Sequence, residues 1–282
     1  MSYRLEVAAK HCPSASELRE ALGLADLCGM PEDPQQDWAE QGLYLFRRDL
    51  STRSTGVAWA EDHVEVTIRA SAAPEDCELA LRLVEAVAEL SGAGEIESEN
   101  FGAVALAELR QLHDTKWMHQ QSVSGARVVA AMINDGRGPM GVPGPVRDFW
   151  IGPRMLGELT AAGPADEFPS RLLAEMRRVQ WSVPSQYRTA GIFLSQPKPK
   201  QEGDKETKLV IWLPEEHLVL SRVDRVALRA GDDDVVVVPF DALPELAAGA
   251  GELLDECQWL VRPVADDDWA RIVARAREIR DR

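Results

Sequence analysis

The order in which strand-like and helix-like segments follow one another is the feature that most restricts the fold of this chain. Strand patterns come in neighbouring pairs across short polar turns, as in 56–61 with 63–70 and in 225–230 with 235–240. Helical patterns form separate runs and do not alternate with single strands. Because parallel strands need a long crossover connection, this order predicts an α+β fold with antiparallel sheets built from hairpins and two subdomains.

The clearest helix is expected to begin near Pro74, since proline suits the first helical turn. Apolar side chains then recur at the spacing of one helix face, at Ala80, Leu83, Val84, Val87 and Leu90. Further helices are expected over 101–113, 152–163, 167–180 and 266–282, the last capped by Asp266. Further strands are expected over 3–9, 43–48, 125–133, 187–196, 207–214 and 257–261.

A glycine-rich stretch, INDGRGPMGVPGP at 133–145, spaces Gly136, Gly138 and Gly141 as in a dinucleotide-binding loop. Such a loop needs a helix that opens at the last glycine and holds the pyrophosphate. Pro143 and Pro145 stand where that helix would begin, which is incompatible with its early geometry. We therefore expect a turn without a nucleotide. The segment 136–146 is expected to connect an acidic N-terminal subdomain, 1–135, to a C-terminal subdomain, 147–282.

Acidic residues are concentrated in the first part of the chain. The formal net charge is −16, and residues 1–100 hold 20 Asp and Glu against 8 Lys and Arg. Segment 61–99 alone carries 11 acids and two arginines. A field of this sign repels nucleic acid and accelerates encounter with a basic protein; a purely solubilising surface is the alternative. We expect a basic protein partner, such as a toxin or effector domain, and no nucleic acid.

The candidate partner-binding residues are the acids of the helix that begins near Pro74 and of the segment that follows it. They are Glu75, Asp76, Glu78, Glu85 and Glu89 on the helix, with Glu95, Glu97 and Glu99 expected in its exit loop. Because the apolar stripe of the helix faces the core, these carboxylates are expected on the opposite, exposed side.

No group of residues has the pattern of a catalytic or metal site. His113 and His119 are six residues apart and so lie on different faces of a helix, and the four cysteines lack zinc-ligand spacing. Walker loops and nucleophile elbows are not found either. We expect no catalytic residue, metal or cofactor, while a hydrolase or transferase with an unrecognised site remains the alternative.

The compartment follows from two further features. The chain has no run of about 18 apolar residues, and its first residues lack a secretory signal, so a cytoplasmic protein without a membrane contact is expected.

The segment 196–208 holds four of the six lysines. We expect this hairpin connection to be mobile and cleaved early by proteases.

Several segments give the chain a diffuse family resemblance. They are VDRVALRAGDDDVVVVPFDALPEL, LLDECQWLV and DDDWARIVARA in the second half and CELALRLVEAVAEL in the first. The chain resembles acidic cytoplasmic immunity-type proteins encoded beside type VI and other interbacterial toxins. The resemblance implies a non-catalytic protein-binding module that neutralises a cognate bacterial toxin, and it carries over no residue roles. An adaptor of a secretion apparatus is a further alternative.

Overall fold

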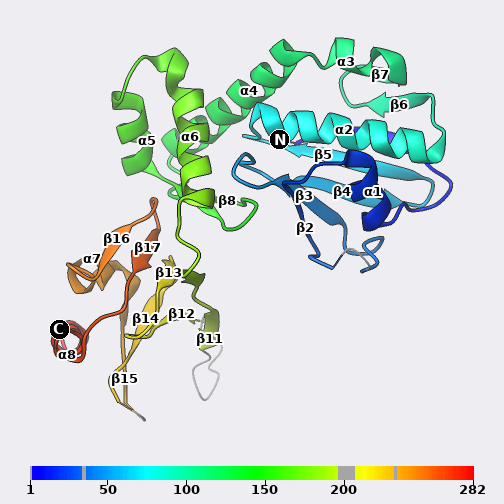
Figure 1. Cartoon of the computed structure of the whole chain (residues 1–282). Helices are drawn as coiled ribbons and strands as arrows, with labels where there is room; N and C mark the ends of the chain where they lie inside the picture. Colours follow the sequence, from blue (N-terminus) through cyan, green and yellow to red (C-terminus); the bar gives the residue numbers. More distant parts are fainter. Residues whose placement is uncertain (1, 34–35, 196–206, 232–233) are drawn as a thin grey trace, which may run out of the picture. The chain divides into compact units, whose positions relative to one another are not determined.

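The computed structural model describes residues 2–33, 36–195, 207–231 and 234–282 (Figure 1). The chain divides into two compact units, unit 1 (Met1–Ser182) and unit 2 (Val183–Arg282). The expected connection over 136–146 lies inside unit 1. There β8 (Met140–Val142) pairs with β9 (Phe149–Ile151). The glycine- and proline-rich stretch is therefore part of a small hairpin.

Unit 1 is built on a seven-stranded antiparallel sheet in the order β2-β3-β4-β5-β1-β6-β7. Its strands are β1 Ser2–Ala8, β2 Leu27–Met30, β3 Leu43–Arg47, β4 Thr55–Ala60, β5 His63–Arg69, β6 Glu95–Ser98 and β7 Gly102–Ala105. The alternation of β5 shows how the sequence sets the two faces of this sheet. Val64, Val66 and Ile68 are buried, and the residues between them are half-buried.

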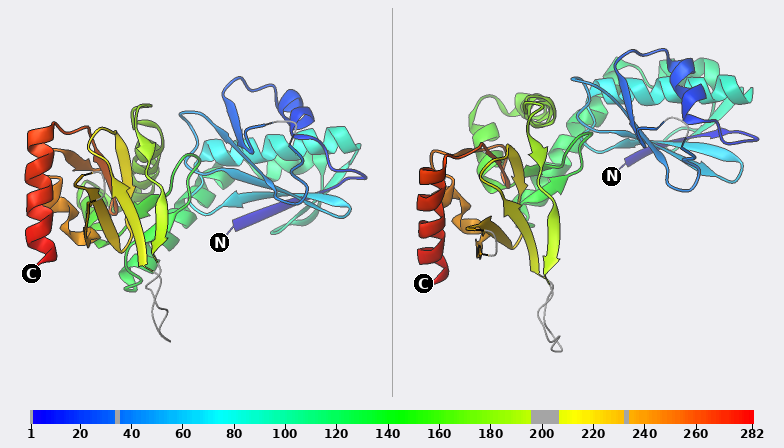
Figure 2. Two further views of the ribbon diagram at one scale, coloured as in Figure 1. Left: turned by 90° about the horizontal axis from the view of Figure 1, so that it is seen from below. Right: turned by 60° about the horizontal axis from the view of Figure 1, so that its bottom comes forward.

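The helices of unit 1 are α1 Ala15–Leu22, α2 Pro74–Ser91, α3 Leu109–Leu112, α4 Thr115–Asn134, α5 Pro153–Ala161 and α6 Phe168–Trp181. Helices α1 and α2 cover one face of the sheet and close the core over β1 and β5 (Figure 2). α2 begins at Pro74 as expected. Of its predicted stripe, Leu90 is 38 % exposed and the other four residues are buried. Ser14 caps α1 and Glu17 returns the bond to its backbone.

Two segments of unit 1 have a different structure from the one expected. The segment 125–133, expected as a strand, forms the second half of α4. The segment 101–113, expected as a helix, holds β7, a 3-10 turn at Leu106–Glu108 and the single turn of α3. In both places tertiary pairing decides the structure: α4 packs on α2, and β7 completes a hairpin with β6.

Unit 2 contains two four-stranded sheets, in the orders β10-β13-β17-β16 and β11-β12-β14-β15. The strands are β10 Arg188–Thr189, β11 Ile192–Ser195, β12 Thr207–Trp212, β13 Leu218–Ser221, β14 Arg225–Arg229, β15 Val235–Pro239, β16 Gly251–Leu253 and β17 Gln258–Val261. The predicted hairpins β11–β12 and β14–β15 are confirmed, and the α+β class with them. Two neighbouring pairs, β10–β13 and β12–β14, are parallel.

Two helices complete unit 2, α7 Leu243–Leu246 and α8 Asp266–Arg280. α8 packs on β15 and contributes Trp269 to a core around the fully buried Trp212. The residue that caps α8 is Ala265, so the expected cap at Asp266 is displaced by one residue. Most of the expected mobile connection, 196–206, lies outside the described residues. In the described part of the chain, no helix has the length and apolarity to cross a membrane.

Candidate functional site

Asp76 is not part of an exposed acidic surface, because the residue is only 1 % exposed. Its Oδ2 accepts hydrogen bonds from the backbone N–H groups of Thr52, Arg53 and Ala73 and from the Thr52 hydroxyl, at 2.9–3.1 Å. One carboxylate thus serves donors at the first turn of α2 and in the segment between β3 and β4. The expected exposure of Asp76 is wrong, and the side chain anchors the start of α2.

Three further acids of α2 are held by arginines. Glu75 pairs with Arg177 of α6 at 3.1 Å. Arg110 donates to both oxygens of Glu85 at 2.6 Å and to Glu78 at 2.5 Å, and these hydrogen bonds raise the pKa of its guanidinium. The acidic side of α2 is therefore compensated within unit 1. Its fifth predicted acid, Glu89, is exposed.

The last three predicted acids lie in and after a strand. Glu95 and Glu97 belong to β6, where an exit loop was expected, and Glu99 follows it directly. All three are exposed, while Ile96 and Ser98 between them are buried. Because side chains alternate along a strand, the three glutamates stand on the face of the sheet opposite the core.

The pairing of strands brings these glutamates next to others that the sequence analysis missed. β6 pairs with β1, and β1 pairs with β5, so that Glu6 is the Cα partner of both Glu65 and Glu97. Directly opposed side chains have Cβ atoms about 4.5–5.5 Å apart. Three carboxylates therefore form a row across three strands.

We call Glu6, Glu65, Glu95, Glu97 and Glu99 the acidic sheet face. Helices α1 and α2 lie on the other side of the sheet (Figure 2). In the strand patterns 3–9 and 63–70, alternation already predicted that Glu6 and Glu65 lie on the face opposite to that of their apolar neighbours. Their meeting depends on register between strands distant in sequence, which alternation does not specify.

Few cations balance the acidic sheet face. Arg4 Nη1 lies 3.4 Å from Glu65 Oε2, on a side chain that is 54 % exposed. His63 Nε2 lies 3.9 Å from Glu6, at the limit of an ion pair. Glu99 accepts a hydrogen bond from the Arg4 backbone N–H at 3.0 Å. Among the described residues, no ion pair involves Glu95 or Glu97, so the acids of this face outnumber the cations paired with them.

Small side chains stand beside several carboxylates of the acidic sheet face. Ala58 is the strand partner of Glu65, and Ala103 is the partner of Glu97. Both alanines are exposed, as is Ala8 two residues after Glu6. On the β6 side of the face, where Glu95 and Glu97 have no ion-pair partner among the described residues, the basic side chains of an approaching protein can reach these exposed carboxylates.

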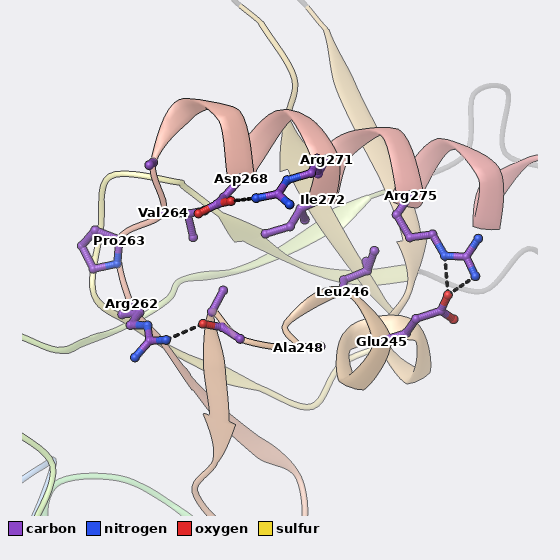
Figure 3. Close-up of a pocket in the computed structure, with 13 residues that line it drawn as sticks. Glu245, Leu246, Ala248, Arg262, Pro263, Val264, Asp268, Arg271, Ile272 and Arg275 are labelled. Carbon is purple, nitrogen blue, oxygen red and sulfur yellow. Dashed lines mark hydrogen bonds and ion pairs between the residues drawn. The ribbon is translucent and has the colours of Figure 1, made fainter.

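A cavity of about 440 Å³ lies in unit 2 between α7, α8 and the chain that precedes α8 (Figure 3). Its lining includes the apolar side chains of Leu246 and Ile272 and three arginines. Each arginine already has a partner within the unit: Arg271 pairs with Asp268, Arg275 with Glu245, and Arg262 donates to the Gly249 carbonyl. Two of the three arginines are thus paired with carboxylates, and the third is hydrogen-bonded to a backbone carbonyl.

A second cavity, of about 230 Å³, lies in unit 1 beside Tyr3. The Tyr3 hydroxyl is 2.6 Å from Ser98 Oγ and 2.7 Å from His113 Nε2. His113 Nδ1 is 3.0 Å from the Leu109 carbonyl. A carbonyl only accepts, so Nδ1 carries the proton and Nε2 accepts from Tyr3. The histidine is fully buried, and burial lowers its pKa. This network ties β1 and β6 to α3.

The other sequence candidates are placed apart from one another. His113 ends α3, whereas His119 lies within α4. Within the described ranges, no three His, Cys, Asp or Glu side chains are grouped to hold a metal ion. Around the glycine-rich stretch, a helix precedes Gly136 and the strand β8 contains Gly141. This is the reverse of the strand–loop–helix order of a dinucleotide site.

Comparison with known proteins adds no relative. No family model, curated protein or solved structure matches the chain. The resemblance to immunity-type proteins therefore stays a prediction, and the candidate site rests on the geometry of the acidic sheet face.

Proposed function

We propose that the chain is a non-catalytic binding protein of the cytoplasm that neutralises a bacterial toxin by covering it. The acidic sheet face is the contact for a basic surface of that toxin. One observation carries this proposal: the row formed by Glu65, Glu6 and Glu97 on the face of the sheet opposite α1 and α2.

The physical reason for this proposal is that the row of three carboxylates lowers the stability of the free protein. Like charges directly opposite each other on adjacent strands destabilise a sheet. An arrangement that costs stability in the free protein is expected where function requires it. Lysines and arginines of a bound partner would relieve the repulsion, and the same charges would steer the encounter.

The test compares two triple variants with the same change in net charge. The first, Glu6→Gln with Glu65→Gln and Glu97→Gln, removes the row. The matched control neutralises three exposed acids of unit 2, Glu215→Gln, Glu252→Gln and Asp267→Asn. Partners are captured from the native host on wild-type protein. The association rate and the inhibition of the captured toxin are then measured at low and high salt.

We expect the row variant to associate about tenfold more slowly than wild type at low salt, with the difference shrinking as salt screens the charges. The control should keep most of the wild-type rate. The free row variant should be more stable by roughly 0.5–1 kcal/mol, because the repulsion is gone.

Three results would overturn this proposal. The first is a captured partner whose association rate responds equally to both triple variants, which would reduce the face to general net charge. The second is the absence of a toxic partner together with turnover in a hydrolase or transferase screen, which would favour an enzyme. Capture of secretion-apparatus components alone would favour an adaptor.

A further inference from the structure

The strand β11 of unit 2 is an edge strand with an unusual surface. Among the described residues, its strand partner is β12, at the end of the order β11-β12-β14-β15. Its residues Ile192, Phe193 and Leu194 are 52 %, 50 % and 58 % exposed. Since side chains alternate, Ile192 and Leu194 lie on one face of the sheet and Phe193 on the other. Both faces of this edge are therefore apolar.

The direction in which the backbone N–H and C=O groups of β11 point follows from the hydrogen bonds of the neighbouring strand β12. The Lys208 carbonyl accepts from Asp224 N–H at 3.1 Å, and the Lys208 N–H donates to the Asp224 side chain at 2.7 Å. Both groups of Lys208 thus point toward β14. Its partner across the hairpin is Leu194, so this is a pair without mutual hydrogen bonds. The N–H and C=O groups of Leu194, and by alternation of Ile192, point to the open edge.

Within its described residues, this edge strand carries few of the features that usually keep such strands from pairing. Natural edges are short, or carry charged side chains, proline or a bulge; β11 is short, and its sequence IFLS has neither charge nor proline. Ile192 is the strand partner of Val210, which is fully buried. The core face of the sheet therefore continues to β11, where Ile192 and Leu194 are more than half exposed. An added strand would extend both the hydrogen-bond ladder and the apolar surface.

We propose that β11 accepts an extended, uncharged and apolar segment of a partner protein as a fifth strand of its sheet. Uncharged backbone groups flanked by apolar side chains on both faces select such a strand. A second copy of the chain fits less well. Each copy carries a net charge of −16, so two copies repel one another. The proposal does not depend on the acidic sheet face.

The probe is a fluorescein-labelled peptide, Gly-Ser-Ile-Thr-Val-Thr-Gly-Ser, titrated with the full chain and followed by anisotropy. A second peptide carries N-methyl groups on the isoleucine and valine, and a third on the two threonines. Because only one edge of a bound strand faces β11, one methylated peptide should bind like the parent. The other should bind at least about tenfold more weakly.

The matched protein variants are Leu194→Pro and Leu194→Thr. Proline removes the N–H that points outward and leaves the β12 ladder intact, so the fold should survive. Threonine shortens the side chain but keeps the N–H. We expect binding to be lost in Leu194→Pro and retained, within a few-fold, in Leu194→Thr. Circular dichroism and the protection of the buried Cys257 thiol verify that unit 2 stays folded in both variants.

Sedimentation velocity of the wild type, over a range of concentrations, tests the second copy. A dimer that disappears in Leu194→Pro would replace the proposed occupant with the chain itself. The proposal also fails if the parent peptide shows no binding at millimolar protein. It fails again if both methylated peptides bind like the parent, or if the folded Leu194→Pro variant binds like wild type.

Discussion

The buried carboxylate of Asp76 offers the most direct test of how unit 1 is held together. In Asp76→Ala, three backbone N–H groups and the Thr52 hydroxyl lose their common acceptor in a site that is 1 % exposed. A buried donor without a partner costs about 1–3 kcal/mol. The Ala73 N–H keeps Thr52 Oγ1 as an acceptor and the Thr52 hydroxyl keeps the Ser71 carbonyl, so the N–H groups of Thr52 and Arg53 are the donors that lose most. We expect unit 1 to lose about 3–5 kcal/mol of unfolding free energy.

Two buried cysteines allow this loss to be measured separately in each unit. Cys77 follows Asp76 in α2 and is 0 % exposed, and Cys257 is 2 % exposed in unit 2. The rate at which a thiol reagent modifies each cysteine reports the free energy of opening around it. Mass spectrometry of peptides resolves the two sites in one sample. Labelling of Cys77 should accelerate by a factor of roughly 10² to 10³ or more, and that of Cys257 should not change.

The neighbouring Glu75→Ala variant is the control. Glu75 pairs with Arg177 through side chains that are 39 % and 34 % exposed, so its loss should cost at most about 1 kcal/mol. Rates of Cys77 modification measured in full denaturant correct for any direct effect of the residue at position 76 on the reactivity of the thiol. Loss of less than about 1 kcal/mol at Cys77 in Asp76→Ala would refute the anchoring role of this carboxylate.

Two further expectations concern glycine and histidine. A Cβ at Gly125 would lie 2.2 Å from the Ser71 backbone nitrogen, so Gly125→Ala should destabilise unit 1 by about 2 kcal/mol or more. Gly157 lies in open space on α5, so Gly157→Ala should stabilise unit 1 by roughly 0.5–1 kcal/mol. Urea unfolding measures both changes. Burial lowers the pKa of His113 below its ordinary value of 6.5, so the unfolded chain takes up the proton first and the stability of unit 1 should fall as the pH drops below 6.5. The pH dependence of Cys77 labelling should be flatter in His113→Gln; an unchanged slope would assign it to other groups.

Local sequence signals were sufficient where one pattern dominated. The alternation of 63–69 and the apolar stripe of 74–91 each match a single structure, β5 and α2. The segment 125–133 was ambiguous, because a short apolar run fits a strand or a buried helix. Read with the preceding residues, Ser122, Gly125, Ala126, Val129 and Ile133 recur at helical spacing, and all five are buried.

The candidate site shows a different limit. Acidity directed attention to α2, but the sequence holds no sign that Arg110 and Arg177 neutralise that helix from 25 or more residues away. The alternation of Glu95 and Glu97 around Ile96 was a usable signal for β6 and was missed. That Glu6 lies between Glu65 and Glu97 is a property of the sheet order, which arises only when the strands assemble.

The position of β1 in the middle of its sheet has a consequence for biosynthesis. β1 leaves the ribosome before both of its neighbours, yet Leu5 pairs with Val66 on one side and with Ser98 on the other. A nascent chain that does not yet include Ser98 cannot complete the sheet. Until then the apolar residues of β1 stay available to chaperones. Contacts between residues so distant in sequence also slow folding. Synthesis of unit 1 therefore passes through a long interval in which this interior strand lacks at least one of its two partners.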